Sequence, residues 1–164
     1  MNKFFVEPSD VNLEDRSINI SSSIDVKHIS RVLRMNVGQE VLISNSEGID
    51  YLCEITAIDK ERVLCNILKY DLQSNESNIY ITLLQCIPKG SKMEMILQKN
   101  VEVGVSNFIP IASKRCVSKL EEGKKIKTKI ERWNKIVREA AMQSKRSLIP
   151  KVENPRDFKE IENI

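Results

Sequence analysis

The sequence is 164 residues long, with 41% hydrophobic and 30% charged residues and a formal net charge of +3. This composition is typical of a soluble globular protein, and the length suffices for one domain of ordinary size or two small ones. No apolar run approaches the ~18 residues that indicate a transmembrane helix, and the amino terminus turns acidic too early for a secretory signal, so neither is expected.

The first part of the chain has the pattern of a small β-rich module with one helix. Residues 23–33 place Val26, Ile29 and Val32 on one apolar face at helical spacing. Stretches rich in β-branched residues, separated by turn residues, predict strands at 3–6, 17–20, 41–44, 51–58 and 63–69. Several short strands around one helix favour a small barrel, which closes its own edges.

A polar stretch at 71–78 is the predicted linker, and the pattern changes after it. The nearly continuous apolar run 79–87 predicts a strand covered on both faces of a parallel sheet, and 108–112 predicts a second buried strand. Two strands are too few for a stable sheet of this kind. We therefore expect the chain either to be a fragment or to complete its sheet with a partner.

Each of these two strands is followed by a predicted helix. Residues 91–103 begin with a Ser91–Glu94 capping box, and 128–144 begin with a Thr128–Glu131 capping box. Gly104 is placed to end the first helix. Two strand–helix units in succession favour right-handed crossovers between parallel strands.

The cysteines show no CxxC spacing, and three of the four lie in apolar strand-like runs. Buried free thiols are therefore expected, rather than a metal site or a disulfide framework. The four are Cys53, Cys65, Cys86 and Cys116.

Charge is distributed unevenly along the chain. Residues 1–78 contain 8 basic and 13 acidic side chains, whereas 79–164 contain 18 and 10. Between Lys114 and Arg146 alone there are 12 basic and 4 acidic residues. Clustered lysine and arginine favour a polyanionic partner such as RNA, and a solvated helix face with excess lysine is the alternative.

Two polar stripes follow the helices of the second part. On the first helix Lys92, Lys99 and Glu102 share a stripe with Gln98 beside it, and Lys89 lies just beyond a strand's carboxyl end, where open α/β sheets bind ligands. On the second helix, a stripe at offsets 0, 3, 7, 11 and 14 consists of Arg132, Lys135, Glu139, Gln143 and Arg146. Such a stripe can grip phosphates while its carboxylate orients an arginine, and surface salt bridging is the alternative.

The helix of the first module carries a third basic stripe, formed by Lys27, Arg31 and Arg34, with the single histidine, His28, beside it. RNA contact is one interpretation and a solvated face is the other. His28 has no Ser, Cys or Asp at a recognisable spacing, which argues against a general base. The sequence contains no P-loop, no GxGxxG and no zinc spacing, so no cofactor-binding residue is identified.

An ordered set of short motifs along nearly the whole chain resembles one family. The set comprises His28-Ile-Ser-Arg31-Val-Leu-Arg34 with Gly38, Lys89-Gly90-Ser-Lys92-Met93-Glu94, Gln98-Lys99, Glu102-Val-Gly104-Val, Pro110, and Glu131-Arg132-Trp133 with Glu139-Ala140-Ala141-Met-Gln143-Ser-Lys-Arg146. It is similar to the ribosomal RNA small subunit methyltransferase E family, the 16S rRNA N3-uridine methyltransferases of the SPOUT superfamily.

The resemblance implies a PUA-like RNA-binding β-barrel at residues 1–72 and the first half of an α/β SPOUT-type methyltransferase domain at 78–164. It implies a cytoplasmic enzyme that uses S-adenosylmethionine, dimerises through its catalytic domain and methylates 16S rRNA in the small ribosomal subunit. The family's cofactor site is a trefoil knot built from a glycine-rich loop and a later segment, neither of which occurs in this sequence. The cofactor site is thus expected outside these residues, and this chain alone is expected to be inactive.

The resulting candidate RNA-binding residues are Lys27, His28, Arg31, Arg34, Lys89, Lys92, Lys99, Arg115, Arg132, Gln143 and Arg146, with Glu102 and Glu139 as orienting carboxylates. No catalytic residue is identified. A truncated, non-catalytic protein that binds ribosomal RNA is the alternative function, and a protein-interaction module with a charged surface is a third.

Overall fold

The computed structural model describes residues 1–70, 76–113 and 124–163. The chain divides into two compact units. The first unit contains Met1–Glu76 and Lys145–Leu148, and the second contains Ser77–Ser144 and Ile149–Ile164. The expected domains were 1–72 and 78–164, whereas the first unit extends to Glu76 and also includes 145–148, a segment that follows the second unit's long helix in sequence.

The first unit is a curled six-stranded sheet with the order β1-β4-β5-β6-β3-β2. All neighbouring strands are antiparallel except β1 and β4, which are parallel. The strands are β1 (Lys3–Phe5), β2 (Val11–Asn12), β3 (Ser17–Ile20), β4 (Glu40–Ser44), β5 (Asp50–Ile58) and β6 (Val63–Tyr70). The predicted strands are confirmed, with β2 as an addition. Alternate residues such as Cys53, Ile55, Cys65 and Ile67 are buried, as a sheet with one covered face requires.

The predicted closure into a barrel is not what the described residues show. The pairing order ends at β1 on one side and β2 on the other, so these two strands do not pair with each other. Between them the chain makes a short 3₁₀ turn, η1 (Pro8–Asp10), and Pro8 has no N–H to give to a strand ladder. The sheet is therefore curled but open between its two shortest edge strands.

The predicted helix of the first unit is confirmed as two consecutive parts, α1 (Ser23–Lys27) and η2 (His28–Val32). Ser22 caps the first part by accepting a hydrogen bond from the Asp25 N–H. The second part is a π turn, in which the Leu33 N–H reaches the carbonyl of His28, five residues back. Val26 and Ile29 anchor this segment in the core.

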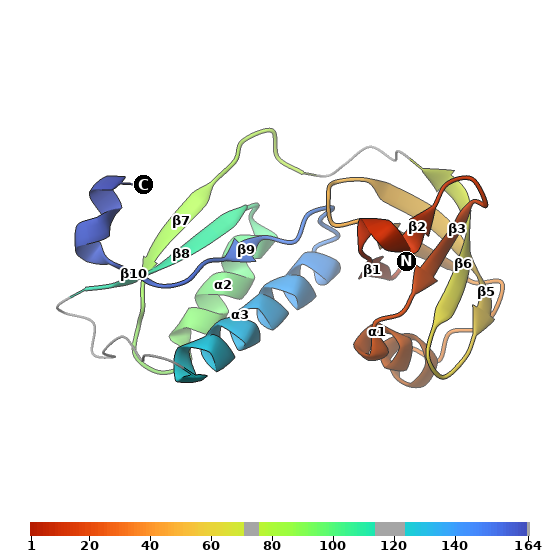
Figure 1. The fold of residues 1–164 in the computed structure, drawn as a ribbon, viewed down its shortest axis with the longest axis horizontal. Coiled ribbons are helices and arrows are strands. Elements are labelled where there is room, and N and C mark those ends of the chain that lie inside the picture. The colour runs from red at the N-terminus through yellow and green to blue at the C-terminus, as the bar shows by residue number, and fades with distance from the viewer. Residues whose placement is uncertain (71–75, 114–123, 164) are drawn as a thin grey trace. The chain divides into compact units, whose positions relative to one another are not determined.

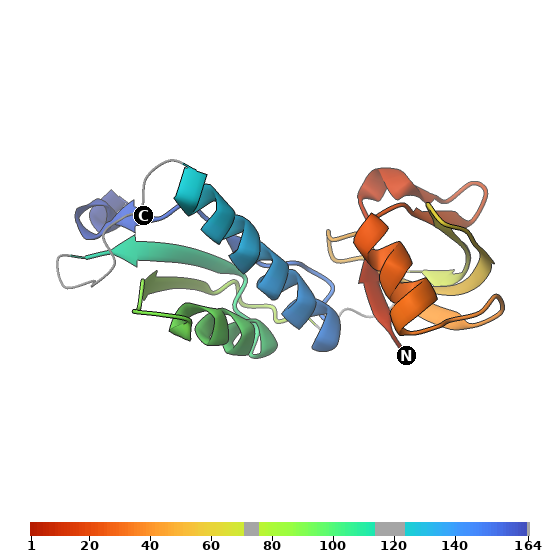
Figure 2. The same cartoon turned by 90° about the horizontal axis from the view of Figure 1, so that it is seen from below.

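The second unit is a parallel sheet with two helices on one face (Figures 1 and 2). Strand β8 (Asn107–Ala112) lies between β7 (Thr82–Cys86) on one side and both β9 (Lys151–Val152) and β10 (Arg156–Asp157) on the other. Helices α2 (Lys92–Glu102) and α3 (Lys124–Gln143) connect the strands, and a 3₁₀ helix, η3 (Phe158–Asn163), follows β10. Successive crossovers that move in the same direction across a sheet place both helices on the same face.

The core between the sheet and the helices is apolar. Trp133 and Val137 of α3, Leu97 of α2 and Phe108 of β8 are each at most 1% exposed. The predicted pair of strand–helix units is confirmed. Strands β9 and β10 were not predicted, because two-residue strands carry no periodicity. Among the described helices, none is both long and apolar enough to cross a bilayer.

Pro110 explains why two short strands, rather than one long one, pair with the far edge of β8. The carbonyl of Phe108 accepts the Glu153 N–H on that edge, whereas the carbonyl of Ile111 accepts the Ile87 N–H on the β7 side. Because successive residues of a strand face opposite edges, Pro110 faces the same edge as Phe108. Its missing N–H coincides with the interruption between β9 and β10.

The strand predicted over 79–87 is shorter and more exposed than expected. Strand β7 pairs only with β8, so it is an edge of the described sheet. Ile79, Tyr80, Ile81 and Leu84 are 68%, 73%, 41% and 38% exposed. The expectation of a strand covered on both faces is therefore wrong for the described residues, because both helices lie on a single face.

Neither predicted capping box forms. Ser91 precedes α2 but makes no side-chain cap hydrogen bond, and the Glu94 carboxylate instead binds Arg132 of α3. Thr128 lies inside α3, which begins at Lys124. The first box is absent because Glu94 pairs with Arg132 of another helix, and the second is absent because α3 begins before Thr128.

Two of the four thiols are buried as expected. Burial raises the pKa of Cys53 to about 12, with Cys65 adding to the shift, and burial raises the pKa of Cys65 to about 12. Cys86 is exposed, against expectation, because it ends the edge strand β7. Cys116 lies outside the described residues.

Candidate nucleic-acid interface

The predicted basic stripe of the first unit is only partly helical: Lys27 ends α1 and Arg31 lies in η2, whereas Arg34 follows η2 with a φ of 51°, which breaks the helical spacing. Lys27, Arg31 and Arg34 are all exposed. Val32, on the same segment, is 70% exposed. An exposed segment that combines cations with apolar side chains can contact both phosphates and bases.

His28 is placed differently from its cationic neighbours. Its ring is half-buried and lies edge-on to the fully buried ring of Phe4, with 6.1 Å between the ring centroids. This packing attaches the helical segment to the core of the curled sheet. A structural role explains the position of His28 without any proton-transfer partner.

The candidate lysines of the second unit, Lys89, Lys92 and Lys99, are all exposed. Lys89 lies in the turn between β7 and α2, directly before Gly90, whose φ of 72° requires the left-handed region. Lys99 forms an ion pair with Glu102, with 2.9 Å between Nζ and Oε2. This hydrogen bond from Lys99 lowers the pKa of Glu102, with a smaller contribution from Gln98. Glu102 therefore holds a lysine, and its role toward RNA stays a prediction.

The predicted stripe on α3 is present over most of its length. Arg132, Lys135, Glu139 and Gln143 lie in α3 and are exposed. Arg132 also connects the two helices, with 2.8 Å between its Nη2 and Oε1 of Glu94. The arginine side chain is 66% exposed, so it remains accessible to a phosphate.

A shallow groove of about 490 Å³ separates the two helices of the second unit. The amides of Gln98 and Gln143 and the carboxylates of Glu94 and Glu139 line it, together with apolar atoms of Met95 and Ile136. Side chains of this kind can donate to and accept from nucleobase edges. The structure thus brings Glu139 and Gln143 together with α2 residues.

Arg146 does not belong to this stripe, which corrects the helical interpretation. Helix α3 ends at Gln143, and Lys145 has a φ of 57°, which breaks the helical periodicity. The Arg146 side chain is only 7% exposed, and its Nη2 lies 2.6 Å from Oε2 of Glu76 in the first unit. A buried, paired guanidinium is not available for RNA in this conformation. Arg115 lies outside the described residues.

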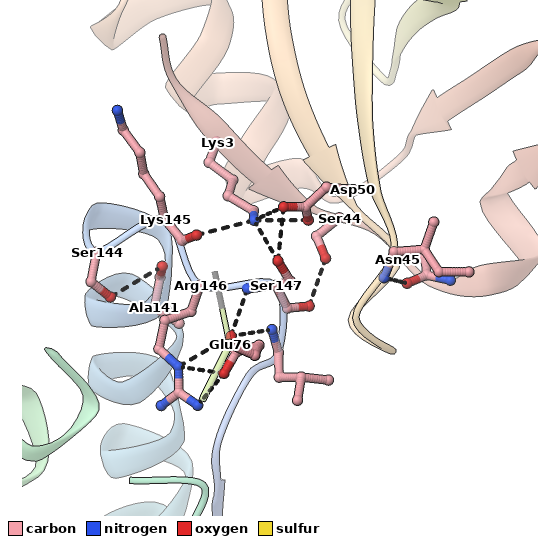
Figure 3. Close-up of polar contacts among 12 residues, drawn as sticks. Lys3, Ser44, Asn45, Asp50, Glu76, Ala141, Ser144, Lys145, Arg146 and Ser147 are labelled. Atoms are coloured by element: carbon pink, nitrogen blue, oxygen red, sulfur yellow. Dashed lines mark hydrogen bonds and ion pairs between the residues drawn. The ribbon is translucent and has the colours of Figure 1, made fainter. Parts of the chain in front are cut away.

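The structure reveals a buried polar cluster in the first unit that sequence reasoning missed (Figure 3). Nζ of Lys3 lies 2.8 and 2.7 Å from the two carboxylate oxygens of Asp50, and the Ser147 hydroxyl donates to Asp50 Oδ2 at 2.8 Å. Burial lowers the pKa of Lys3, and the hydrogen bond to Asp50 opposes that shift. The available signal was a charged residue at the start of the predicted strand 3–6 and another directly before the predicted strand 51–58.

The described residues do not fit S-adenosylmethionine as a pocket. The second unit's described glycines, Gly90 and Gly104, lie in turns with positive φ, which accounts for glycine at both positions without a ligand. The hollows described in the second unit are open and lined largely by charged and amide side chains. We therefore derive no step through the cofactor.

Comparison with known proteins identifies two family models. A model described as an RNA methyltransferase domain matches residues 75–164, and one described as an RNA methyltransferase PUA domain matches 25–68. The ribosomal RNA small subunit methyltransferase E of Bacillus subtilis is 34% identical over 161 residues, which are 98% of this chain and 62% of that protein. This chain therefore spans less than two thirds of that relative's length.

Solved structures show the same similarity. A ribosomal RNA small subunit methyltransferase E from Neisseria gonorrhoeae, bound to S-adenosyl methionine, is 32% identical with a TM-score of 0.84, covering 98% of this chain and 64% of that one. A methyltransferase from Legionella pneumophila, in complex with the cofactor SAM, is 26% identical with a TM-score of 0.83, covering 99% and 66%.

Proposed function

Because this chain belongs to the RNA methyltransferase family that includes ribosomal RNA small subunit methyltransferase E, we propose that it serves in the S-adenosylmethionine-dependent methylation of N3 of a uridine in 16S rRNA. In this proposal the residues described here bind and orient the RNA. The single observation that supports this role is the exposure of cationic side chains along α1–η2 and along the α2–α3 helices.

In the first unit, Lys27, Arg31 and Arg34 contact phosphates and set the register of the RNA. In the second unit, Lys89, Lys92 and Lys99 extend the cationic surface at the start and along the outer side of α2. Arg132 and Gln143 of α3 contribute a guanidinium and an amide, and Glu139 and Glu102 orient neighbouring side chains. Arg146 is left out of this set because Glu76 already binds its guanidinium.

S-adenosylmethionine, when bound, would supply the methyl group. We propose that the candidate RNA-binding side chains take no part in holding the cofactor. The proposed partners are the 16S rRNA of the small ribosomal subunit and a second copy of the chain contacted through the second unit. A ribosomal RNA substrate in a bacterial-type family implies a cytoplasmic location.

The salt dependence of RNA binding tests this proposal. Fluorescence anisotropy of a 16S rRNA fragment, measured over a range of KCl concentrations, gives the number of phosphate contacts as a slope. Arg31→Ala and Arg132→Ala should each weaken binding and lower the slope by about 0.7 to 0.9 units, the value of one phosphate contact.

Matched controls are available in each unit. Arg62→Ala removes an exposed arginine of the first unit that pairs with Asp59, and Arg156→Ala removes an arginine of the second unit that pairs with Glu153. Both control variants should keep the wild-type slope. A wild-type slope for Arg31→Ala and Arg132→Ala would contradict the proposed interface.

A further inference from the structure

We infer that the short segment Lys145–Leu148, here called the clasp, is an integral part of the first unit, so that this unit is discontinuous in sequence and its stability depends on chain that follows α3. The inference rests on the contacts of the clasp within the first unit and does not depend on the proposed function. Its hydrogen-bond partners in the rest of the first unit are the side chains of Lys3, Ser44, Asp50 and Glu76.

The centre of the clasp completes a buried ionic cluster. Lys3 Nζ, besides its two bonds to Asp50, lies 3.3 Å from both the Ser147 hydroxyl and the carbonyl of Lys145. The Ser44 hydroxyl donates to the Ser147 carbonyl at 2.7 Å. The Lys3 side chain is fully buried, and Ser44 and Ser147 are each 0% exposed. Without the clasp, Lys3 and Asp50 would lose polar partners at a buried site, where unsatisfied groups are costly.

Glu76 fixes the remainder of the clasp with one carboxylate (Figure 3). Arg146 donates to Oε2 of Glu76 from Nη2 at 2.6 Å, and its Nε is shared between Oε2 at 3.1 Å and Oε1 at 3.3 Å, so the guanidinium contacts both carboxylate oxygens. Oε1 also accepts the backbone N–H groups of Ser147 at 2.7 Å and of Leu148 at 3.1 Å. Glu76 therefore binds the backbone of the clasp as well as its charge.

The last residue of the clasp, Leu148, pairs with the turn between β4 and β5. Leu148 forms an isolated antiparallel bridge with Glu47, in the connection between β4 and β5. Its Cδ2 would lie 3.8 Å from a Cβ added at Gly48, which is ordinary packing distance. Side-chain burial, charge pairing and backbone pairing thus coincide in four consecutive residues. An incidental surface contact would not combine all three.

The test is hydrogen–deuterium exchange on the full chain. Ser147→Ala and Arg146→Met should each speed exchange of the amides of β1, β4 and the start of β5 by about tenfold or more, because the open form gains population when buried partners are lost. Amides of α2 and β8 should exchange at wild-type rates. Arg156→Met, which removes an arginine of the second unit, is the control and should leave β1 and β4 unchanged. Wild-type exchange of β1 and β4 in both clasp variants would overturn the inference.

A charge exchange separates the two functions of Glu76. In a double variant with Glu76→Arg and Arg146→Glu, the ion pair can re-form, but an arginine at 76 cannot accept the N–H groups of Ser147 and Leu148. We expect protection of β1 and β4 to stay well below wild type. Full recovery of protection would show that the pair acts through charge alone and would overturn the proposed binding of the clasp backbone. If Arg146→Met speeds amide exchange throughout the first unit while amides of the second unit keep their wild-type rates, the whole first unit depends on the clasp, as the inference states.

Discussion

Arg146 and Glu76 are 70 residues apart in the sequence, yet both are held in the first unit by a two-pronged ion pair. Burial of Glu76 would by itself raise its pKa, but the hydrogen bonds from Arg146 and from the Leu148 and Ser147 N–H groups outweigh burial, so the pKa of Glu76 lies below its ordinary value of 4.5. A carboxylate held in this way links the stability of the first unit to pH.

This link gives a signed prediction for Glu76→Gln. A depressed carboxyl pKa contributes stability that is fully present above the unfolded-state pKa and is lost as pH falls through the folded-state pKa. The difference in free energy of unfolding between wild type and Glu76→Gln should therefore be largest near neutral pH and should shrink below about pH 4.5. Urea unfolding at a series of pH values measures it. Glu61→Gln, at an exposed turn position, should follow the wild-type profile, and a pH-independent difference for Glu76→Gln would contradict the assignment.

The buried pair of Lys3 and Asp50 should be strongly coupled. Lys3→Met leaves Asp50 with an uncompensated buried charge, and Asp50→Leu does the same to Lys3, so each should cost about 3 to 5 kcal/mol of unfolding free energy. The double variant should cost much less than the sum, because it removes both charges together. A double-mutant cycle by urea unfolding measures the coupling. Strict additivity would show that the two groups do not depend on each other.

Arg132→Ala should weaken RNA binding, whereas removing the carboxylate that pairs with Arg132, that of Glu94, should strengthen it. Glu94→Gln releases Arg132 from its carboxylate, so affinity for the 16S rRNA fragment should rise if Arg132 contacts phosphate. Stability should change by less than about 1 kcal/mol, because the pair is partly exposed and such pairs contribute little. Anisotropy and urea unfolding give the two values. Glu131→Gln, on α3 like Arg132, controls for the loss of one acidic charge. Equal effects of Glu94→Gln and Glu131→Gln on affinity would show that only the net charge matters.

The three described cysteines should react in a fixed order with an alkylating reagent. At pH 8, Cys53 and Cys65 are protonated because burial raises each pKa to about 12, and the reactive species is the thiolate. Cys86 is exposed and should be modified first. Mass spectrometry after short exposure to iodoacetamide gives the order. Cys53 and Cys65 should be modified only after unfolding in urea, and early modification of either would contradict their burial.

The edge strand β7 should promote self-association. Leu84 is 38% exposed on a strand whose second edge is unpaired among the described residues, and apolar strand edges recruit other chains. Leu84→Lys should shift the mass measured by light scattering toward monomer. Leu13→Lys, at a 55% exposed leucine of the first unit, is the control and should leave the mass unchanged. A wild-type chain that is monomeric at high concentration would exclude association through this edge.

Local sequence pattern was sufficient for the longer elements. The β-branched runs of β5 and β6 and the apolar spacing of α2 and α3 predicted these elements within a few residues, because hydrophobic periodicity is a local property. The ordered motifs also identified the family, and helical spacing placed Arg132, Lys135, Glu139 and Gln143 on one face. These features depend on residues that are near one another in the chain.

Tertiary structure alone decided the rest. Lys3 meets Asp50 47 residues away and Ser147 144 residues away, and no local pattern reports such a pair. Arg146 continued the helical stripe in the sequence, but the positive φ of Lys145 ended that periodicity and Glu76 bound its side chain. Whether a charged residue faces solvent or a buried partner depends on the desolvation and pairing energies of the folded chain, and these are defined only when distant segments have come together.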